Sequence, residues 1–143
     1  MENIITQMKY LIIVVGSSFS WLFGAWDIGL TVLIAFIIID YLTGLTRAYI
    51  NKELSSDIGL KGITRKCVIL VVLIVAVLLD RLLNADTWVF RTLSWYFYIA
   101  NEGISILENC ASLGLPIPEK LADALGQLKE GKKKETVKFV ARN

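Results

Sequence analysis

Residues 67–79 read Cys-Val-Ile-Leu-Val-Val-Leu-Ile-Val-Ala-Val-Leu-Leu and form the centre of an apolar segment that extends from about residue 63 to residue 83. A β-branched run of this kind is typical of a buried strand in a soluble protein, but this segment is too long for a strand. The hydrocarbon core of a bilayer is about 30 Å thick and requires about 20 mostly apolar residues per helix. The segment therefore predicts a transmembrane helix.

Three further segments, at about 10–26, 28–49 and 88–112, have lengths in the range that crosses a bilayer. The chain of 143 residues is 55% hydrophobic, and its apolar residues are gathered into long blocks. This pattern is typical of a small integral membrane protein. We expect an all-α fold with a domain of four transmembrane helices in residues 1–118. Residues 119–143 should form a cytoplasmic amphipathic helix and a basic tail.

The first segment carries small residues at intervals of four, at Gly16, Ser20 and Gly24. Because residues four apart share one face of a helix, this face predicts close packing against another helix. Lys9 before an apolar stretch is similar to the start of a secretory signal, but no small-x-small cleavage site follows. We therefore expect the segment to be retained.

The distribution of lysine and arginine predicts the orientation of the spans, because positively charged loops stay in the cytoplasm. The connection between the second and third spans and the C-terminal tail are both basic, whereas the two other connections carry only Asp27 and Asp86. We therefore expect both termini in the cytoplasm. The basic residues in and around the connection between the second and third spans are Arg47, Lys52, Lys61, Arg65 and Lys66.

The fourth segment differs from the others because polar side chains follow one side of the predicted helix. We expect this polar seam to line a water-filled path or to pair with other helices. A helix of this kind can also lie on the membrane surface, but the basic tail would then be outside, against the charge rule. The seam consists of Arg91, Ser94, Tyr98, Asn101, Glu102, Ser105, Glu108 and Asn109.

Charged residues within spans usually find a partner inside the bundle. Asp40 and Arg47 share a helix face, which predicts an ion pair between these two buried charges. Asp80 is a third charge within a span and lies near the outer end, where its side chain can extend to the interface. Glu102 lies about halfway along its helix, so its partner must be another helix or water.

The region after the fourth span begins with Gly114, Pro116 and Pro118, which end the helix. Residues 119–128 then form an amphipathic pattern with leucines on one face, which predicts a helix lying against the inner leaflet. The run Lys132, Lys133 and Lys134 has two interpretations, a solvated tail or a site that binds anionic lipid headgroups.

The sequence is poor in catalytic residues. It contains no histidine, the commonest metal ligand and the commonest general base at neutral pH, and its two cysteines cannot make a metal site by themselves. A glycine-rich phosphate loop and a nucleophile elbow are also absent from the sequence. We expect no enzymatic activity, no cofactor, no metal site and no nucleic-acid partner.

Two blocks of sequence carry a resemblance to a known family. The first is Asp-Tyr-Leu-Thr-Gly at 40–44, with Leu-Ser-Ser at 54–56 and Lys-Gly-Ile at 61–63. The second is Tyr-Ile-Ala-Asn-Glu-Gly-Ile-Ser-Ile-Leu-Glu-Asn at 98–109, followed by Gly-Leu-Pro-Ile-Pro at 114–118. Over about residues 28–130 the chain resembles the toxin-secretion and phage-lysis holins.

The resemblance implies a protein that gathers as a homo-oligomer in the cytoplasmic membrane of a bacterial host and opens lesions there. A cell-wall hydrolase, or a toxin in some relatives, would leave through the lesions as cargo without necessary direct contact. Two other functions fit the helical pattern equally well: a small ion or solute channel or transporter, and a non-permeating holin antagonist or scaffold. The resemblance, and not the periodicity, favours the holin.

Overall fold

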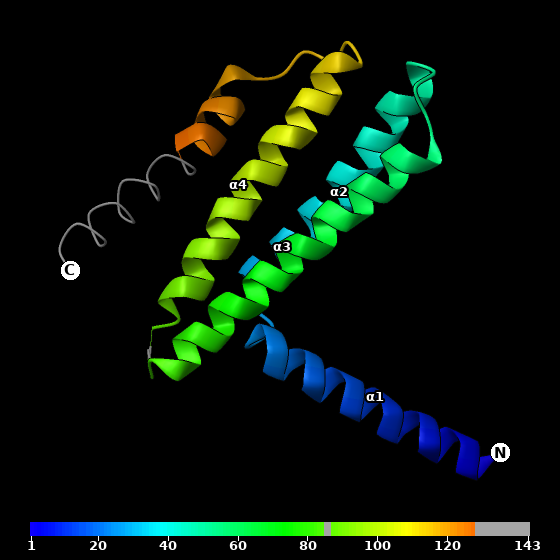
Figure 1. Ribbon diagram of the computed structural model, residues 1–143, viewed down its shortest axis with the longest axis vertical. Coiled ribbons are helices and arrows are strands. Elements are labelled where there is room, and N and C mark those ends of the chain that lie inside the picture. The colour runs from blue at the N-terminus through cyan, green and yellow to red at the C-terminus, as the bar shows by residue number, and fades with distance from the viewer. Residues whose placement is uncertain (85–86, 128–143) are drawn as a thin grey trace.

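The chain is helical throughout most of the computed structural model, which describes residues 1–84 and 87–127. The helices are α1 (Glu2–Phe23), α2 (Ile28–Ile50), α3 (Ser56–Leu82) and α4 (Val89–Ser112), and residues 119–127 form a further short helix (Figure 1). The described residues contain no strand, so the all-helical prediction is confirmed. Helices α1, α2 and α3 are long and apolar enough to cross a membrane.

Local side chains determine where α2 and α3 begin. Asp27 accepts a hydrogen bond from the backbone N–H of Leu30 at 3.0 Å, and Ser55 accepts one from the N–H of Ile58 at 3.3 Å. Such N-caps satisfy backbone donors that have no partner within the helix. Helix α3 consequently begins at the cap, about two turns before the apolar segment predicted to start near residue 63.

The start of α4 depends on a side chain from another helix. Trp88 precedes α4 in a left-handed conformation and provides no side-chain cap. Asp80 of α3 instead accepts hydrogen bonds from the N–H groups of Phe90, at 3.0 Å, and Arg91, at 2.8 Å. The carboxylate also lies at the positive end of the α4 dipole. Asp80, expected near the interface, is therefore buried between α3 and α4.

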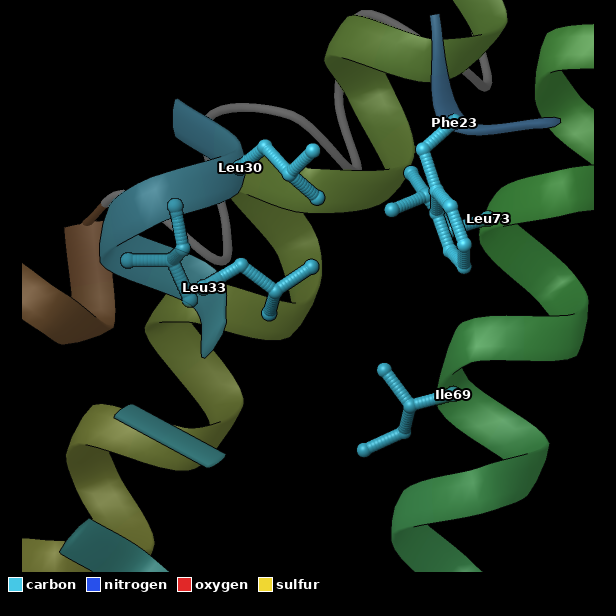
Figure 2. Close-up of a cluster of buried hydrophobic side chains, with 6 residues drawn as sticks. Phe23, Leu30, Leu33, Ile69 and Leu73 are labelled. Carbon is cyan, nitrogen blue, oxygen red and sulfur yellow. The ribbon is translucent and has the colours of Figure 1, made fainter. Parts of the chain in front are cut away.

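Helices α2, α3 and α4 pack together as a bundle in which α4 lies mainly against α2. A close approach between these two helices is possible because Gly29 has no side chain: a Cβ there would lie 0.8 Å from Cζ3 of Trp95. The apolar core occupies the end of the bundle near the α1–α2 connection, as Figure 2 shows. Its buried members are Phe23, Leu30, Leu33, Ile69, Leu73 and Ile99.

Helix α1 does not pack along the bundle. It leaves the end of the bundle at the α1–α2 connection, and its N-terminal end lies far from the other helices (Figure 1). Only its last turns, with Phe19, Leu22 and Phe23, contact the core. The expected face of Gly16, Ser20 and Gly24 is broken, because α1 ends at Phe23 and Gly24 has a φ of 79°. Gly16 has no neighbouring atoms within 4 Å of the position of a Cβ.

The short helix at 119–127 turns back beside α4 (Figure 1). The side chain of Leu125 lies against Gly103 of α4, where a Cβ would be 2.9 Å from Cδ1 of Leu125 and 3.1 Å from Cε2 of Phe36. The helix thus contacts the bundle at Leu125, whereas the sequence pattern predicted that it lies against the lipid leaflet. Leu128, the last residue of the predicted apolar face, lies outside the described residues.

Candidate functional site

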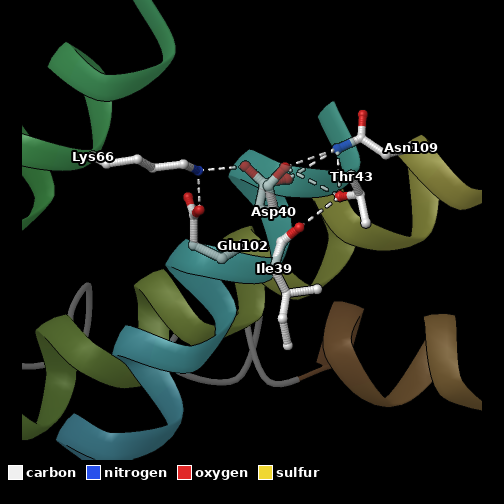
Figure 3. A network of polar contacts seen from close by, with 6 residues as sticks. All are labelled: Ile39, Asp40, Thr43, Lys66, Glu102 and Asn109. Carbon is white, nitrogen blue, oxygen red and sulfur yellow. Dashed lines mark hydrogen bonds and ion pairs between the residues drawn. The ribbon is translucent and has the colours of Figure 1, made fainter. Parts of the chain in front are cut away.

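A cluster of three charged side chains lies between α2, α3 and α4. Lys66 of α3 donates hydrogen bonds to the carboxylates of Asp40 on α2 and Glu102 on α4, and it forms ion pairs with both (Figure 3). All three residues are buried, and Glu102 is 0% exposed. Charges removed from water are stabilised only by such partners, so this charged cluster links the three helices of the bundle.

Asn109 and Thr43 extend the charged cluster along α2 and α4. Nδ2 of Asn109 donates to Oδ1 of Asp40 at 3.1 Å and to Oγ1 of Thr43 at 3.2 Å. The hydroxyl of Thr43 in turn donates to the carbonyl of Ile39 at 2.9 Å. Figure 3 shows Lys66 and Asn109 on the Asp40 carboxylate and Thr43 directed toward the carbonyl of Ile39. Asp40 is therefore held by an ammonium on one side and an amide on the other.

The cluster has one cation for two carboxylates. Oε1 of Glu102 is buried and has no hydrogen-bond partner in the part of the chain that the structure describes. The three groups by themselves carry an excess of one negative charge when all are ionised, and Arg65 of α3 acts on Glu102 electrostatically as a further cation. Oε1 of Glu102 is therefore an acceptor position that the contacts among the described residues leave open.

A second polar network lies at the opposite end of the bundle, around Arg91. Its guanidinium donates from Nε to the carbonyl of Phe23 at 2.8 Å, from Nη2 to the carbonyl of Ala25 at 2.7 Å and from Nη1 to Asp27 at 2.6 Å. Two of these acceptors are carbonyls at and just after the end of α1. Arg91 therefore fixes the α1–α2 connection to the start of α4.

Asp27 combines two roles in this network, as the N-cap of α2 and as the ion-pair partner of Arg91. Partial burial by itself raises the pKa of Asp27, but hydrogen bonds from Arg91 and from the backbone favour the ionised form more strongly. The pKa of Asp27 is lowered from its ordinary value as a result.

The structure separates the predicted polar seam into parts. Arg91 belongs to the network at the α1–α2 connection, whereas Glu102 and Asn109 belong to the charged cluster. Ser94, Tyr98, Asn101 and Ser105 are half-buried, and Glu108 is exposed. The partner of Glu102 comes from another helix, one of the two possibilities that the sequence left open.

The expected ion pair between Asp40 and Arg47 differs from the structure. Arg47, expected as a buried partner of Asp40, is exposed, and Asp40 pairs with Lys66. Asp40 and Arg47 lie seven residues, or about two turns, apart on the same helix. Lys66 approaches Asp40 from the neighbouring helix α3 and contacts it directly. The lysines at 132–134, interpreted as a solvated tail or as contacts to lipid headgroups, lie outside the described residues.

Lys66 is the residue of this cluster that the sequence analysis missed. Its position directly before the apolar run favours a place among the basic residues of the connection between the second and third spans. One signal could have revealed its place: Lys66, Ile69 and Leu73 lie three and seven residues apart, and all three are buried on the same side of α3. A lysine on that buried face requires a carboxylate from another helix.

Comparison with known protein families matches residues 17–130 to the bacteriophage holin family. The chain belongs to this family. Among its relatives, an uncharacterised 14.9 kDa protein in the nagH 3' region of Clostridium perfringens is 63% identical over 92% of this chain and 100% of the relative. A probable holin of Bacillus phage phi105 is 36% identical over 76% of this chain and 80% of the relative. No solved structure matches the chain.

The matched range of the holin family includes all of α2, α3 and α4 and therefore both polar networks. The resemblance found in the sequence is thus confirmed at the level of the family. The holin family is not a known family of enzymes. Membership of this family, together with three helices long and apolar enough to cross a bilayer, indicates that the chain is located in a membrane.

Proposed function

We propose that this chain is a holin that oligomerises in the bacterial cytoplasmic membrane and forms lesions through which a cell-wall hydrolase leaves the cytoplasm. A secreted toxin is the other cargo that a lesion of this kind would release. In this proposal α4 is a fourth span and both termini are cytoplasmic. Membership of the bacteriophage holin family is the observation that carries the proposal.

The packing of the bundle supports lesions built from several chains. One end of the bundle is filled by apolar side chains such as Leu33 and Leu73 (Figure 2), and at the other the polar groups of the charged cluster face each other (Figure 3). A bundle of three packed helices cannot surround a hole wide enough for a folded enzyme. A lesion wall formed by Glu102 and Asn109 would require α4 to separate from α2 and α3.

We place the contact between copies on α1. Its apolar side chains are exposed along the helix, including Leu11, Ile12 and Val15. Gly16 has no side chain, and Ser20, four residues later on the same face, has a small one, which allows close approach of a helix from another copy. Lipid covers the other faces of α1 when it crosses the membrane.

Induced expression in bacteria tests the proposal directly. Dye entry, membrane potential and escape of a cytoplasmic reporter protein are followed together, with and without a co-expressed cell-wall hydrolase. A holin causes sudden depolarisation and release of the reporter, and it causes lysis only when the hydrolase is present. Depolarisation with full retention of the reporter would instead indicate an ion channel, and a sealed membrane would indicate an antagonist or scaffold.

A matched pair of variants tests the proposed role of α1. Gly16→Phe places a ring on the small-residue face, whereas Val14→Phe places the same ring on the opposite side of the helix. We expect Gly16→Phe to abolish or strongly delay reporter release and to reduce cross-linking between copies, with Val14→Phe close to the wild type. Equal behaviour of the two variants, at equal membrane levels, would remove the proposed contact face.

A further inference from the structure

A cavity of about 170 Å³ lies beside the charged cluster, between α2, α3 and α4. Asp40, Lys66 and Asn109 form part of its wall, and Arg47 and Arg65 line it from α2 and α3. Three small residues, Gly44, Gly59 and Gly62, contribute to the hollow. One water occupies about 30 Å³ in the liquid, so the cavity has room for a group much larger than water.

The charges of the cavity are unequally satisfied. Lys66 is paired with Asp40 and Glu102, whereas Arg47 and Arg65 have no carboxylate within 4 Å among the described residues. Asp40 is the only acidic residue in the lining, against three cations. Two guanidinium groups that form no salt bridge among the described residues therefore border a cavity whose lining has an excess of positive charge, although Arg65 also acts on Glu102 electrostatically. Guanidinium groups bind phosphate through paired N–H donors.

Neutral hydroxyl donors line the same cavity. Tyr41 passes over two glycines: a Cβ on Gly62 would lie 3.3 Å from Cε2 of Tyr41, and a Cβ on Gly59 would lie 3.8 Å from its hydroxyl. The hydroxyl therefore lies at the α3 side of the cavity, and Ser105 adds a second hydroxyl from α4. Cations and hydroxyl groups from three helices together form a lining suited to an oxyanion.

The depth of the cavity suits the headgroup of a lipid. Helices α2 and α3 meet the same end of the bundle at Ile28 and Leu82. With about 20 residues per crossing, the opposite boundary of the hydrocarbon lies near residue 48 on α2 and near residue 62 on α3. Arg47 and Arg65 are each within one helical turn of that boundary. A basic pocket between spans at this level can receive a lipid phosphate.

We propose that this cavity binds the phosphate of one anionic phospholipid, with Arg47 and Arg65 as its principal ligands. In the orientation proposed above this lipid belongs to the cytoplasmic leaflet, and this placement rests on the proposed function. The binding site itself does not depend on lesion formation. The acyl chains of the lipid would lie against the apolar surface of the spans. The bound phosphate would neutralise the two arginines beside the charged cluster.

Lipid binding to the full-length chain, delipidated in a mild detergent, tests this proposal by native mass spectrometry. The probes are phosphatidylglycerol, phosphatidylcholine and inorganic phosphate. We expect one phosphatidylglycerol retained per chain, at least tenfold tighter than phosphatidylcholine, and displacement of the lipid by inorganic phosphate at high concentration. The paired substitution Arg47→Gln with Arg65→Gln should weaken phosphatidylglycerol binding at least tenfold.

Lys52→Gln is the matched control, because it removes a cation from the nearby α2–α3 connection without altering the cavity lining. It should change the affinity less than twofold. Equal affinities of the control and the paired arginine variant would overturn the site, since general attraction to basic residues would then explain binding. Saturable binding of inorganic phosphate without lipid retention would overturn the lipid assignment. Circular dichroism and thermal unfolding verify that both variants are folded.

Discussion

At the scale of single residues, the structure depends on charges that lie far apart in the sequence. Lys66 joins Asp40 and Glu102, and Arg91 joins Asp27 to the backbone at the end of α1. Each cation holds groups from two other helices or connections. Removing one of these cations therefore affects several helices at once. The loss of folding free energy arises because the buried groups that it held are left without a partner.

Replacing Lys66 with methionine tests the charged cluster. Lys66→Met keeps an unbranched side chain, shorter by one atom, but leaves two buried carboxylates without their counter-ion, and such changes cost roughly 3–5 kcal/mol. We expect a large loss of stability in denaturant titrations of the detergent-solubilised protein. Adding Glu102→Gln should restore part of the loss, and Lys61→Met on the exposed side of α3 should have little effect. An unchanged midpoint for Lys66→Met would contradict the role of the cluster.

The ion pair of Asp27 predicts a dependence of stability on acid. Because the pKa of Asp27 is lower in the folded chain than its ordinary value of 3.8, its contribution to stability is complete above about pH 3.8. The contribution is lost as the pH falls through the lowered pKa of the folded state. Thermal unfolding between pH 2 and pH 6 should show this loss in the wild type. The Asp27→Asn variant should be less stable at pH 6 and should lose less on acidification.

At the scale of helices, contacts at glycine decide how closely elements approach. Gly29 allows the ring of Trp95 to lie against α2, and Gly103 allows Leu125 to lie against α4. By contrast, a Cβ on Gly16 would have no atom of another residue within 4 Å, apart from its chain neighbours and the backbone of its own helix. Glycine is therefore required for close packing at Gly29 and Gly103 but not at Gly16 within one chain. Of these three glycines, the spacing of small residues in the sequence predicted a packing role only for Gly16.

A comparison of two alanine substitutions tests this difference. Gly29→Ala places a Cβ inside the ring of Trp95, so the helices must move apart, and overpacking of this kind costs about 1–3 kcal/mol. Gly16→Ala meets no neighbouring atom and improves helix propensity. Thermal unfolding of the purified proteins should therefore show a lower midpoint for Gly29→Ala alone. A decrease of equal size in both variants would place the importance of Gly29 in its backbone instead of the Trp95 contact.

At the scale of the whole molecule, the relation of α4 to the membrane determines the proposed topology. The apolar criterion is met by α1, α2 and α3, whereas α4 carries polar residues on the side that faces α2 and α3. Pairing inside the bundle removes these groups from contact with lipid. A polar helix can therefore cross the membrane when its neighbours satisfy its side chains.

Single cysteines in a cysteine-free variant test the crossing of α4. We expect cysteines at positions 52 and 120 to be protected from a membrane-impermeant maleimide in intact spheroplasts, and a cysteine at position 87 to react. All three should react after permeabilisation, which serves as the control. Reaction of position 120 in intact spheroplasts, with position 52 protected, would place α4 on the outer surface.

The apolar runs by themselves determined the class of the protein, because segments of this length and composition are soluble only in lipid and there must be helical. The bounds of α2 and α4 were also predicted closely, since Asp27 and the residues at 112–118 act within one or two turns. Only the tertiary structure decided the partners of the charges. Lys66 lies 26 residues from Asp40 and 36 from Glu102, and helical periodicity shows which face a residue occupies but not which neighbouring helix meets it.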